Sequence, residues 1–342
     1  MDRALELQAE IKKIFGDVPV NLVGGSVRDI VLKREPKDWD YCTPLSPDEI
    51  EEKIRAAGRK PYLIGKKFGT VGFKVPLSQY RTMLEDGTYS EVQDSKINYV
   101  YVEVTTYRKE QYTSTSRKPV VEFITDLDQD LARRDFTINS MVLNDDGTTY
   151  DPFGGRLDIL AKQIKTVGLP KDRIQEDPLR MLRAARFASQ LKFGVDPNLI
   201  GKMRQLGHTI EIVSKERWVT ELDKMLMGPD PMRGIKVLMQ SELMKYILPE
   251  VYLALSEDEA YQALAETFEQ YPDMELNSRW GCLLSFIGHP YTYKEKNDKV
   301  TFVNHEVVRR QLTIGICARL KFPNERTDDL VNNKIVFKTV AL

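Results

Sequence analysis

Two aspartates separated by one residue, Asp38 and Asp40, are of the type and spacing that could hold a metal ion together. They lie in the run Asp-Trp-Asp-Tyr, which we expect to form a short strand. Alternate residues of a strand point to the same side, so both carboxylates should share one face while Trp39 and Tyr41 point into a core. Two carboxylates this close repel each other unless a cation lies between them. The pattern favours Mg²⁺, which takes carboxylate oxygens and shares its remaining positions with phosphate.

A glycine-rich turn precedes the two aspartates and could bind that phosphate. Gly24 and Gly25 follow an apolar run typical of a strand, and residues 27–33 have helical spacing. Backbone N–H groups at a helix start are free to donate to phosphate, and Arg28 adds a guanidinium one turn later. A Gly-Gly pair alone usually marks only a turn, and an Asp-x-Asp alone is usually solvated. The order strand, turn, helix and Asp-x-Asp is far more specific.

This stretch resembles a known superfamily of nucleotidyltransferases, the one that includes DNA polymerase beta. Within it, GGSVRD followed by DWDYCT is similar to the class II tRNA nucleotidyltransferases (CCA-adding enzymes) and the bacterial poly(A) polymerases. The resemblance is strong over about residues 18–250. It implies an α+β fold, with a small mixed β-sheet and helices in an N-terminal head followed by an all-α neck and body. We expect the catalytic head at 1–150, a nucleotide-selecting neck at 151–214 and an RNA-binding body at 215–342, without a full tail domain.

Composition sets the outer limits of this hypothesis. A chain of 342 residues can hold two or more domains, and 42% apolar with 30% charged residues is typical of a globular protein. No apolar stretch reaches membrane-spanning length, and the N-terminus predicts an amphipathic helix rather than a signal peptide. Cys42, Cys282 and Cys317 lack metal-ligand spacing, so we expect reduced thiols in the cytoplasm. Because the formal net charge is −1, RNA binding must come from local basic patches.

Glu103 is the third candidate carboxylate. Val100, Val102 and Val104 alternate with polar residues around it, which predicts a strand over residues 99–105. Taken alone, Glu103 would be a partly exposed residue at the outer end of that strand. The string VEVTTYR matches the family's strand for such a residue. The resemblance implies that Glu103 helps to deprotonate the attacking hydroxyl or to hold metal.

Two polar segments lie near this strand. Residues 76–98 stand where related enzymes usually have a tight turn, and an Asp-Gly signal within them predicts an exposed hairpin or a mobile loop, with no role assigned. Residues 107–119 are polar and basic, which alone indicates a solvated connector. The resemblance implies a flexible loop that reshapes the pocket between nucleotides, and this favours full CCA addition over addition of adenine only.

A further basic element follows at residues 130–160. Alternation predicts a last strand of the sheet through residues 136–142. The strings RRDFTIN and DPFGG resemble signatures of the class II enzymes. The resemblance implies that Arg134 contacts the triphosphate. It leaves supporting roles, such as orienting the ribose or bracing the loop, to three neighbours: Arg133, Asp135 and Asn139.

A second stretch of candidate functional residues has an arginine at every third position. Asp177 followed by proline is typical of a helix start, with Asp177 as N-cap. Arg180, Arg183 and Arg186 step about 60° around this helix at a time, which by itself usually forms a solvated basic face. The string EDPLRMLRAARF instead matches the class II motif that reads the incoming base. It implies that Asp177 and Arg180 form a protein template, with Arg183 and Arg186 stacking, bracing it or reaching phosphate.

The chemistry of such a pair explains a choice of C and A. Both bases present an amino donor where uracil and guanine present a carbonyl acceptor. The carboxylate of Asp177 accepts from the amino group and repels a carbonyl, while Arg180 can donate to the adjacent ring nitrogen. The wrong base leaves buried polar groups unpaired, and this is the penalty that discriminates.

The sequence therefore predicts template-independent nucleotidyl transfer to an RNA 3′ end. With Mg²⁺ at Asp38 and Asp40, the chain would add CMP, CMP and AMP from CTP and ATP to the 3′ end of tRNA. A poly(A) polymerase, or an enzyme adding only C or only A, shares every motif and stays open as an alternative. A catalytically silent RNA-binding protein is disfavoured, because such a protein would not need the charged residues that are present here: Asp38, Asp40, Arg134 and Asp177. No membrane or protein partner is implied, and the oligomeric state is not predicted.

Overall fold

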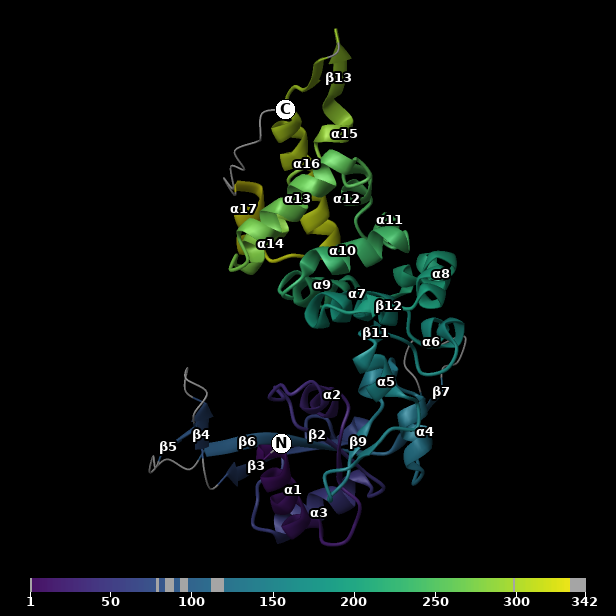
Figure 1. Ribbon diagram of the computed structural model, residues 1–342, viewed down its shortest axis with the longest axis vertical. Helices are drawn as coiled ribbons and strands as arrows, with labels where there is room; N and C mark the ends of the chain where they lie inside the picture. Colours follow the sequence, from purple (N-terminus) through teal and green to yellow (C-terminus); the bar gives the residue numbers. More distant parts are fainter. Residues whose placement is uncertain are drawn as a thin grey trace. The chain divides into compact units, whose positions relative to one another are not determined.

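The computed structural model divides into two compact units (Figure 1). Unit 1 comprises Met1–Ala161 with Lys165–Gly168, and unit 2 comprises Lys162–Ile164 with Leu169–Leu342. Unit 1 contains a mixed sheet and unit 2 is mainly helical, which confirms the α+β fold class. No helix in the described part of the chain is both long and apolar enough to cross a membrane. The structure describes residues 2–77, 80–83, 89–92, 98–111, 120–297 and 299–332.

The main sheet of unit 1 has six strands in the order β10-β9-β1-β2-β6-β3. Its strands are β1 (Asn21–Val23), β2 (Asp40–Thr43), β3 (Thr70–Leu77), β6 (Asn98–Thr106), β9 (Val142–Leu143) and β10 (Thr149–Tyr150). Only β2 and β6 pair in parallel, and the other neighbours are antiparallel. The predicted mixed sheet is therefore confirmed, and its central strands carry the candidate carboxylates.

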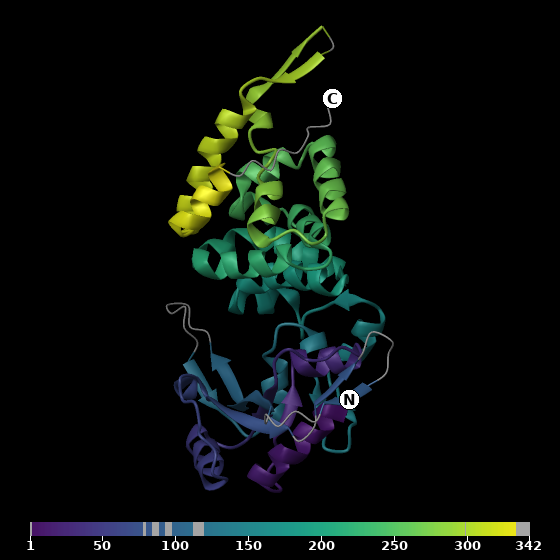
Figure 2. The ribbon, with the colours of Figure 1, turned by 90° about the vertical axis from the view of Figure 1, so that its left-hand side faces the viewer.

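One face of β3 and β6 forms the core of unit 1. The alternating valines of both strands are buried there, and the Phe73 ring of β3 lies 6.3 Å from that of Phe15. Helices α1 and α3 pack against β3 on this side (Figure 2). The residues that alternate with these valines lie on the other face of the two strands. The helices of unit 1 are α1 (Asp2–Phe15), α2 (Gly25–Val31), α3 (Pro47–Ala56), α4 (Leu127–Ala132) and α5 (Gly155–Leu160), with 3₁₀ turns at Lys66–Phe68 and Thr137–Asn139.

The two polar segments form paired strands where they are described. Within residues 76–98, β4 (Tyr80–Met83) and β5 (Tyr89–Val92) pair antiparallel, which confirms the hairpin prediction. Residues 78–79, 84–88 and 93–97 of this insert lie outside the described residues. The prediction of a loop over 107–119 is wrong at its start, because β7 (Arg108–Gln111) pairs with β8 (Val120–Phe123). Residues 112–119 lie outside the described part. All four residues of β7 are polar, so its sequence shows no alternation. The strand is recognised only by its pairing with β8.

The predicted strand over residues 136–142 is also largely wrong. Its first half is the 3₁₀ turn Thr137–Asn139, and only Val142–Leu143 forms β9. Every residue from 136 to 142 is buried, so a period of two cannot separate a core face from a solvent face. Local bonds favour the turn instead: Asp135 Oδ1 accepts from the Phe136 N–H, and Ser140 Oγ donates to the carbonyl of Leu131 at 2.7 Å.

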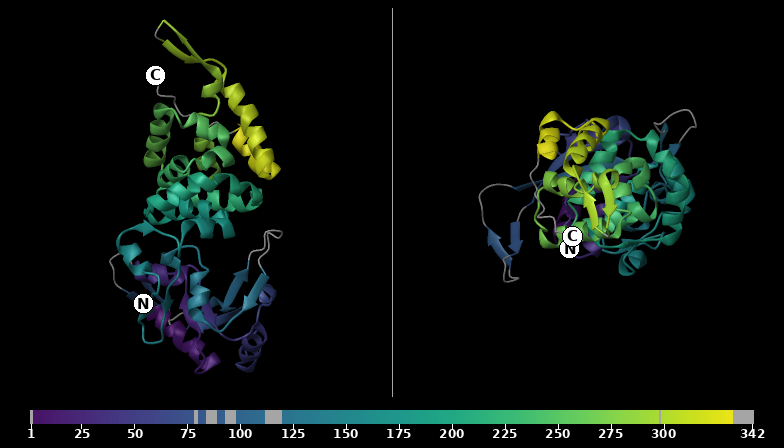
Figure 3. Two further views of the ribbon diagram at one scale, coloured as in Figure 1. Left: turned by 90° about the vertical axis from the view of Figure 1, so that its right-hand side faces the viewer. Right: turned by 90° about the horizontal axis from the view of Figure 1, so that it is seen from above.

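Unit 2 is built around α7, which packs against α9 and α10. Trp218 and Trp280 are fully buried in its core, and α16 and α17 lie side by side (Figure 3). Short pairs β11–β12 and β13–β14 complete it. Its helices are α6 (Pro170–Glu176), α7 (Leu179–Leu191), α8 (Pro197–Leu206), α9 (Lys215–Leu226), α10 (Pro231–Gln240), α11 (Met244–Ile247), α12 (Pro249–Ala254), α13 (Asp258–Gln270), α14 (Leu276–Leu283), α15 (His289–Thr292), α16 (His305–Leu320) and α17 (Asn324–Asn332). Its strands are β11 (Gln163–Ile164), β12 (Gly194–Val195), β13 (Tyr293–Lys296) and β14 (Lys299–Phe302), with a 3₁₀ helix at Gly207–Ile212.

Candidate active site

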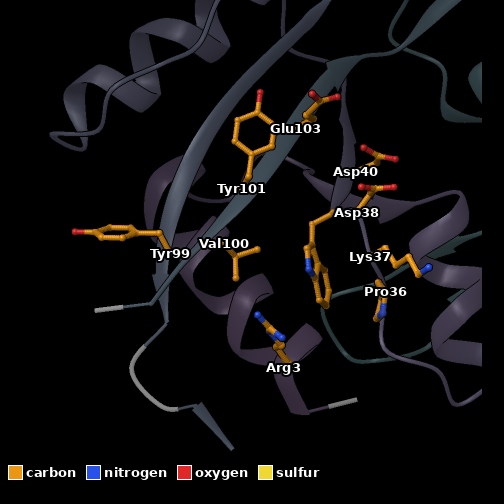
Figure 4. Close-up of a pocket in the computed structure, with 10 residues that line it drawn as sticks. Arg3, Pro36, Lys37, Asp38, Asp40, Tyr99, Val100, Tyr101 and Glu103 are labelled. Carbon is orange, nitrogen blue, oxygen red and sulfur yellow. The ribbon is translucent and has the colours of Figure 1, made fainter. Parts of the chain in front are cut away.

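Strands β2 and β6 bring the three candidate carboxylates together (Figure 4). Asp40 is the first residue of β2 and lies directly opposite Glu103 of β6. Asp38 precedes the strand, so the strand starts two residues later than predicted. The predicted sidedness is nevertheless confirmed, because both aspartates are exposed while Trp39 and Tyr41 are 5% and 0% exposed. The Glu103 N–H donates to the Trp39 carbonyl at 3.0 Å, which ties the segment before β2 to β6.

The surroundings of Asp40 disfavour its ionisation. Asp40 is open to solvent on one side, yet surrounding protein displaces much of its hydration, and this is the main cause that raises its pKa from 3.8 to about 6. The charges of Glu103 and Asp38 raise this pKa further, while Arg134 opposes them. No ready-made group of three or more His, Cys, Asp or Glu side chains for a metal occurs among the described residues. A hard divalent cation that shares its coordination with substrate phosphate nevertheless fits this donor set.

The glycine turn is attached to the same segment. Ser26, in the first turn of α2, donates its hydroxyl to the Asp38 carbonyl at 2.9 Å. Gly24 has φ 78°, a left-handed conformation that favours glycine. A Cβ at Gly24 would lie 3.1 Å from Nη1 of Arg134, so that guanidinium lies close against the turn. The turn, the two aspartates and Arg134 therefore form one site.

Two arginines gather at this turn, and each is oriented by a polar partner. Arg134 Nη2 lies 3.0 Å from Oδ2 of Asp130, a carboxylate that is 1% exposed. Arg28 donates from Nη1 to Asn139 Oδ1 at 2.8 Å. Oriented guanidinium groups next to free backbone N–H groups are suited to phosphate.

Neighbouring strands fix the order of these groups across the sheet. Leu22 of β1 pairs with Tyr41 of β2, so the end of β1 and its glycine turn lie beside Asp40. Glu103 of β6 lies on the other side of Asp40. With neighbouring strands about 4.8 Å apart, the phosphate-binding turn, the aspartates and Glu103 follow one another in a row.

Unit 2 holds Asp177 and Arg180 at the junction of α6 and α7. The prediction of Asp177 as N-cap is wrong by one residue, because α7 begins at Leu179 with Pro178 as its N-cap, but Asp177 Oδ1 still accepts from the Leu179 N–H at 3.1 Å. Asp177 Oδ2 lies 3.0 Å from Nη2 of Arg217 on α9. Arg180 is 8% exposed and donates from Nη1 to Glu176 Oε2 at 2.6 Å. Both side chains of the predicted template are thus fixed in orientation.

The remaining arginines of α7 do not form the solvated face that their spacing usually indicates. Arg186 is 7% exposed and lies 3.0 Å from Oε2 of Glu221 on α9, which is also buried. Its guanidinium carbon lies 4.2 Å from the centroid of the Phe187 ring, and that of Arg183 lies 5.6 Å from the same centroid. Arg186 therefore braces α7 against α9 from within the protein.

Comparison with known proteins identifies the family. The Poly A polymerase head domain family matches residues 20–165, and the family described as the probable RNA and SrmB-binding site of polymerase A matches residues 192–254. The CCA-adding enzyme of Bacillus subtilis (strain 168) is 37% identical over 270 residues, covering 78% of this chain and 59% of that protein. Residues 20–165 of the chain therefore belong to the Poly A polymerase head domain family.

Other members of this family agree in sequence and in fold. The CCA-adding enzyme of Lactococcus lactis subsp. cremoris (strain MG1363) is 35% identical over 264 residues, covering 77% of this chain and 59% of its own length. The CCA-adding enzyme of Bacillus stearothermophilus in complex with CTP has a TM-score of 0.68 at 27% identity, over 96% of this chain and 68% of that one. The Thermotoga maritima enzyme complexed with tRNA has a TM-score of 0.63 at 20% identity and shows a likeness of fold alone. The chain thus spans about three fifths of the length of these curated relatives.

Sequence reasoning missed several partners of the site residues in this family member. Asp130 and Glu176 precede Arg134 and Arg180 by four residues, a helical spacing that could have predicted both pairs. Arg186 and Glu221 are 35 residues apart in the sequence, and no local pattern predicts that they pair. A larger omission is on β6, next to Glu103, where an exposed tyrosine lines the same cavity.

Proposed function

We propose that this chain adds CCA to the 3′ end of tRNA, using CTP and ATP and no nucleic-acid template. The observation that carries this proposal is the row formed by the glycine turn, Asp40 and Glu103, with Arg134 against the turn. That row offers binding groups for a triphosphate and carboxylates for an attacking hydroxyl at one place. Support comes from three curated relatives at 35% to 38% identity, which are CCA-adding enzymes of Bacillus species.

In unit 1, different residues would hold the metal, bind the triphosphate and orient the attacking hydroxyl. Asp38 and Asp40 would hold Mg²⁺, which when bound lowers the pKa of the attacking hydroxyl and stabilises the leaving pyrophosphate. Arg28, Arg134 and the N–H groups after Gly24 bind the triphosphate and hold its reacting phosphorus beside the aspartates. Glu103 faces the 3′-hydroxyl from the other side and orients it or takes its proton. The reaction needs no covalent intermediate with the protein.

Base selection is the proposed task of unit 2. Each oxygen of the Asp177 carboxylate accepts one bond within the protein and keeps a second acceptor site for the amino group of C or A. Arg180, whose orientation Glu176 fixes, would donate to the ring nitrogen. Arg183 stacks beside the template, and Arg186 braces it through Glu221.

The cysteines of the chain support a location for the proposed reaction. Three buried free thiols, at Cys42, Cys282 and Cys317, suit a reducing compartment, and we place the enzyme in the cytoplasm.

A single assay tests the activity: tRNA lacking its last three nucleotides is incubated with CTP alone, ATP alone and both together.

We expect two added nucleotides with CTP alone and three with both. Long products from ATP alone would instead identify a poly(A) polymerase. Addition that stops at one base type would identify an enzyme adding only C or only A. No incorporation under any condition would overturn the proposal and leave an RNA-binding role.

A further inference from the structure

The carboxylates occupy only part of a larger cavity in unit 1. The cavity measures about 570 Å³, and Asp38, Asp40 and Glu103 line its acidic part (Figure 4). Beyond them it is lined by Tyr99 and Tyr101, with Lys37 nearby. The reaction described above uses the acidic part and leaves the aromatic part without a task.

The aromatic part is a regular feature of strand β6. Tyr99, Tyr101 and Glu103 alternate with buried valines, so all three side chains lie on the face turned away from the core. The tyrosines are 55% and 46% exposed. Side chains two residues apart on one face are roughly 7 Å from each other. Two open aromatic rings thus lead in a line to the third carboxylate.

Positive charge accompanies these rings. Lys74 of β3 lies directly opposite Tyr101 in the antiparallel pair, and directly opposite residues share a face of the sheet. Lys37 is exposed on the cavity wall. Aromatic faces with lysines beside them suit single-stranded RNA, whose bases stack on rings while its phosphates meet the charges.

Tyr101 is held in a defined position. A Cβ at Gly72, opposite Glu103, would lie 2.0 Å from the phenol oxygen of Tyr101, so only glycine there lets the phenol lean across the strand. Burial and the neighbouring Glu103 carboxylate raise the pKa of the Tyr101 phenol, and the Tyr62 ring contacts the Tyr101 ring edge-on at 5.8 Å. A ring fixed in advance loses little freedom when a base stacks on it.

The order of the strands gives the direction from which an acceptor arrives. The proposed triphosphate site is at the glycine turn, on the β1 side of Asp40, whereas Glu103 is on the β6 side. In-line displacement places the attacking hydroxyl opposite the leaving pyrophosphate. The hydroxyl therefore comes from the side of β6, where Tyr101 and Tyr99 lie.

We propose that Tyr99 and Tyr101, with Lys74 and Lys37, bind the unpaired 3′-terminal nucleotides of the acceptor RNA. This proposal rests on the proposed function and extends it by stating where the acceptor strand lies. The terminal base stacks on Tyr101, and the preceding base stacks on Tyr99. Tyr101 is in addition a positioning residue, because its hydroxyl keeps the Glu103 carboxylate turned toward the 3′-hydroxyl.

A binding measurement tests the subsite without any need for turnover. A short single-stranded RNA with a fluorescent 5′ label is titrated with protein in EDTA and without nucleotide, and its anisotropy is followed. Tyr99→Ala and Tyr101→Ala should each raise the Kd about tenfold, since stacking on one aromatic ring contributes roughly 1–3 kcal/mol. Tyr101→Phe keeps the ring and should bind within about twofold of the wild type.

The matched control is Tyr150→Ala. Tyr150 is an exposed tyrosine on β10, at the opposite edge of the same sheet, and its loss should leave the Kd unchanged. Steady-state assays add a second readout. The alanine variants should raise KM for tRNA with KM for CTP unchanged, and Tyr101→Phe should lower kcat because Glu103 loses its neighbouring hydroxyl.

Three results would overturn the subsite. They are unchanged RNA binding in both alanine variants, an equal loss in the Tyr150 variant, or a rise in KM for CTP, which would assign the rings to the incoming nucleotide. Failure of the proposed function is a separate result. It would show as a wild-type protein that incorporates no nucleotide, whatever the tyrosine variants do in the binding assay.

Discussion

The two charged regions of this protein differ in how their charges are paired. In unit 1, Asp38, Asp40 and Glu103 are grouped with like charges, and the pKa of Asp40 is raised to about 6. In unit 2, the charged groups of α7 are paired within the protein: Arg180 with Glu176, and Arg186 with Glu221. One region carries charge that a ligand must neutralise, and the other carries charge that the protein has already neutralised.

The difference follows from the two tasks. A site that binds a divalent ion and a triphosphate must leave its charges unsatisfied, and this costs stability in the free protein. A site that compares bases must not move when a wrong base arrives, so its hydrogen-bonding groups are fixed by neighbours. Substitutions in the first region should therefore affect activity more than folding, and those in the bracing pair of the second should affect folding more than activity.

The largest effect is expected for Asp40→Ala. Removing this carboxylate should lower nucleotide incorporation by at least about 10³-fold, because the ion and the phosphorus lose their common anchor. Thermal unfolding should occur at the same temperature or higher, since one repelling charge is gone. Asp48→Ala, an exposed acidic residue in the first turn of α3, serves as control and should keep full activity. An active Asp40→Ala enzyme would remove the metal assignment.

The second effect is on folding, in the paired region. Arg186→Ala leaves Glu221 buried without its partner, and this should cost about 3–5 kcal/mol of unfolding free energy in urea titrations. The double variant Arg186→Met with Glu221→Leu should recover most of that loss. Glu216→Gln on α9 breaks an exposed ion pair with Lys321, which solvent screens, and should leave the unfolding free energy nearly unchanged. Equal losses in the two single variants would mean that burial does not set the strength of these pairs.

The sequence predicted the open region better than the paired one. The sidedness of Asp38 and Asp40 followed from alternation with Trp39 and Tyr41, and the structure confirms it. Such patterns are readable because one side of the segment is buried and the other is not. Around Thr137–Asn139 every residue is buried, so the same rule predicted a strand where the chain forms a turn.

Long-range pairs escaped prediction for a different reason. The partner of Arg186 is chosen by the packing of α7 on α9, and nothing in the residues around Arg186 identifies Glu221. The position of the Tyr101 phenol depends on the neighbouring strand, since Gly72 of β3 provides the space for it. Sequence patterns thus report which face a residue occupies more reliably than which residue it meets.

The third effect is on base choice. Asp177→Asn replaces one acceptor of the carboxylate by an amino donor, which can pair with the carbonyl of uracil. The preference for CTP over UTP, measured as the ratio of kcat/KM values, should fall by about 10²-fold while incorporation of CMP persists. Asp172→Asn, at an exposed position in the first turn of α6, should leave the ratio unchanged. An unaltered ratio in the Asp177 variant would mean that base choice is made elsewhere.

The smallest effect is a pH dependence that Asp40 alone should cause. Its pKa is raised in the folded protein, so its contribution to stability is fully present below the ordinary value of 3.8 and is lost as the pH rises through about 6. In EDTA, Asp40→Asn should therefore become progressively more stable than the wild type over that interval, with no further change above it. Millimolar Mg²⁺ should narrow the difference by stabilising only the wild type, because the ion binds the ionised carboxylate. Thermal melting of both proteins across this pH range, with and without Mg²⁺, measures the effect. A difference that is independent of pH would show that burial and the neighbouring carboxylates do not raise the pKa of Asp40.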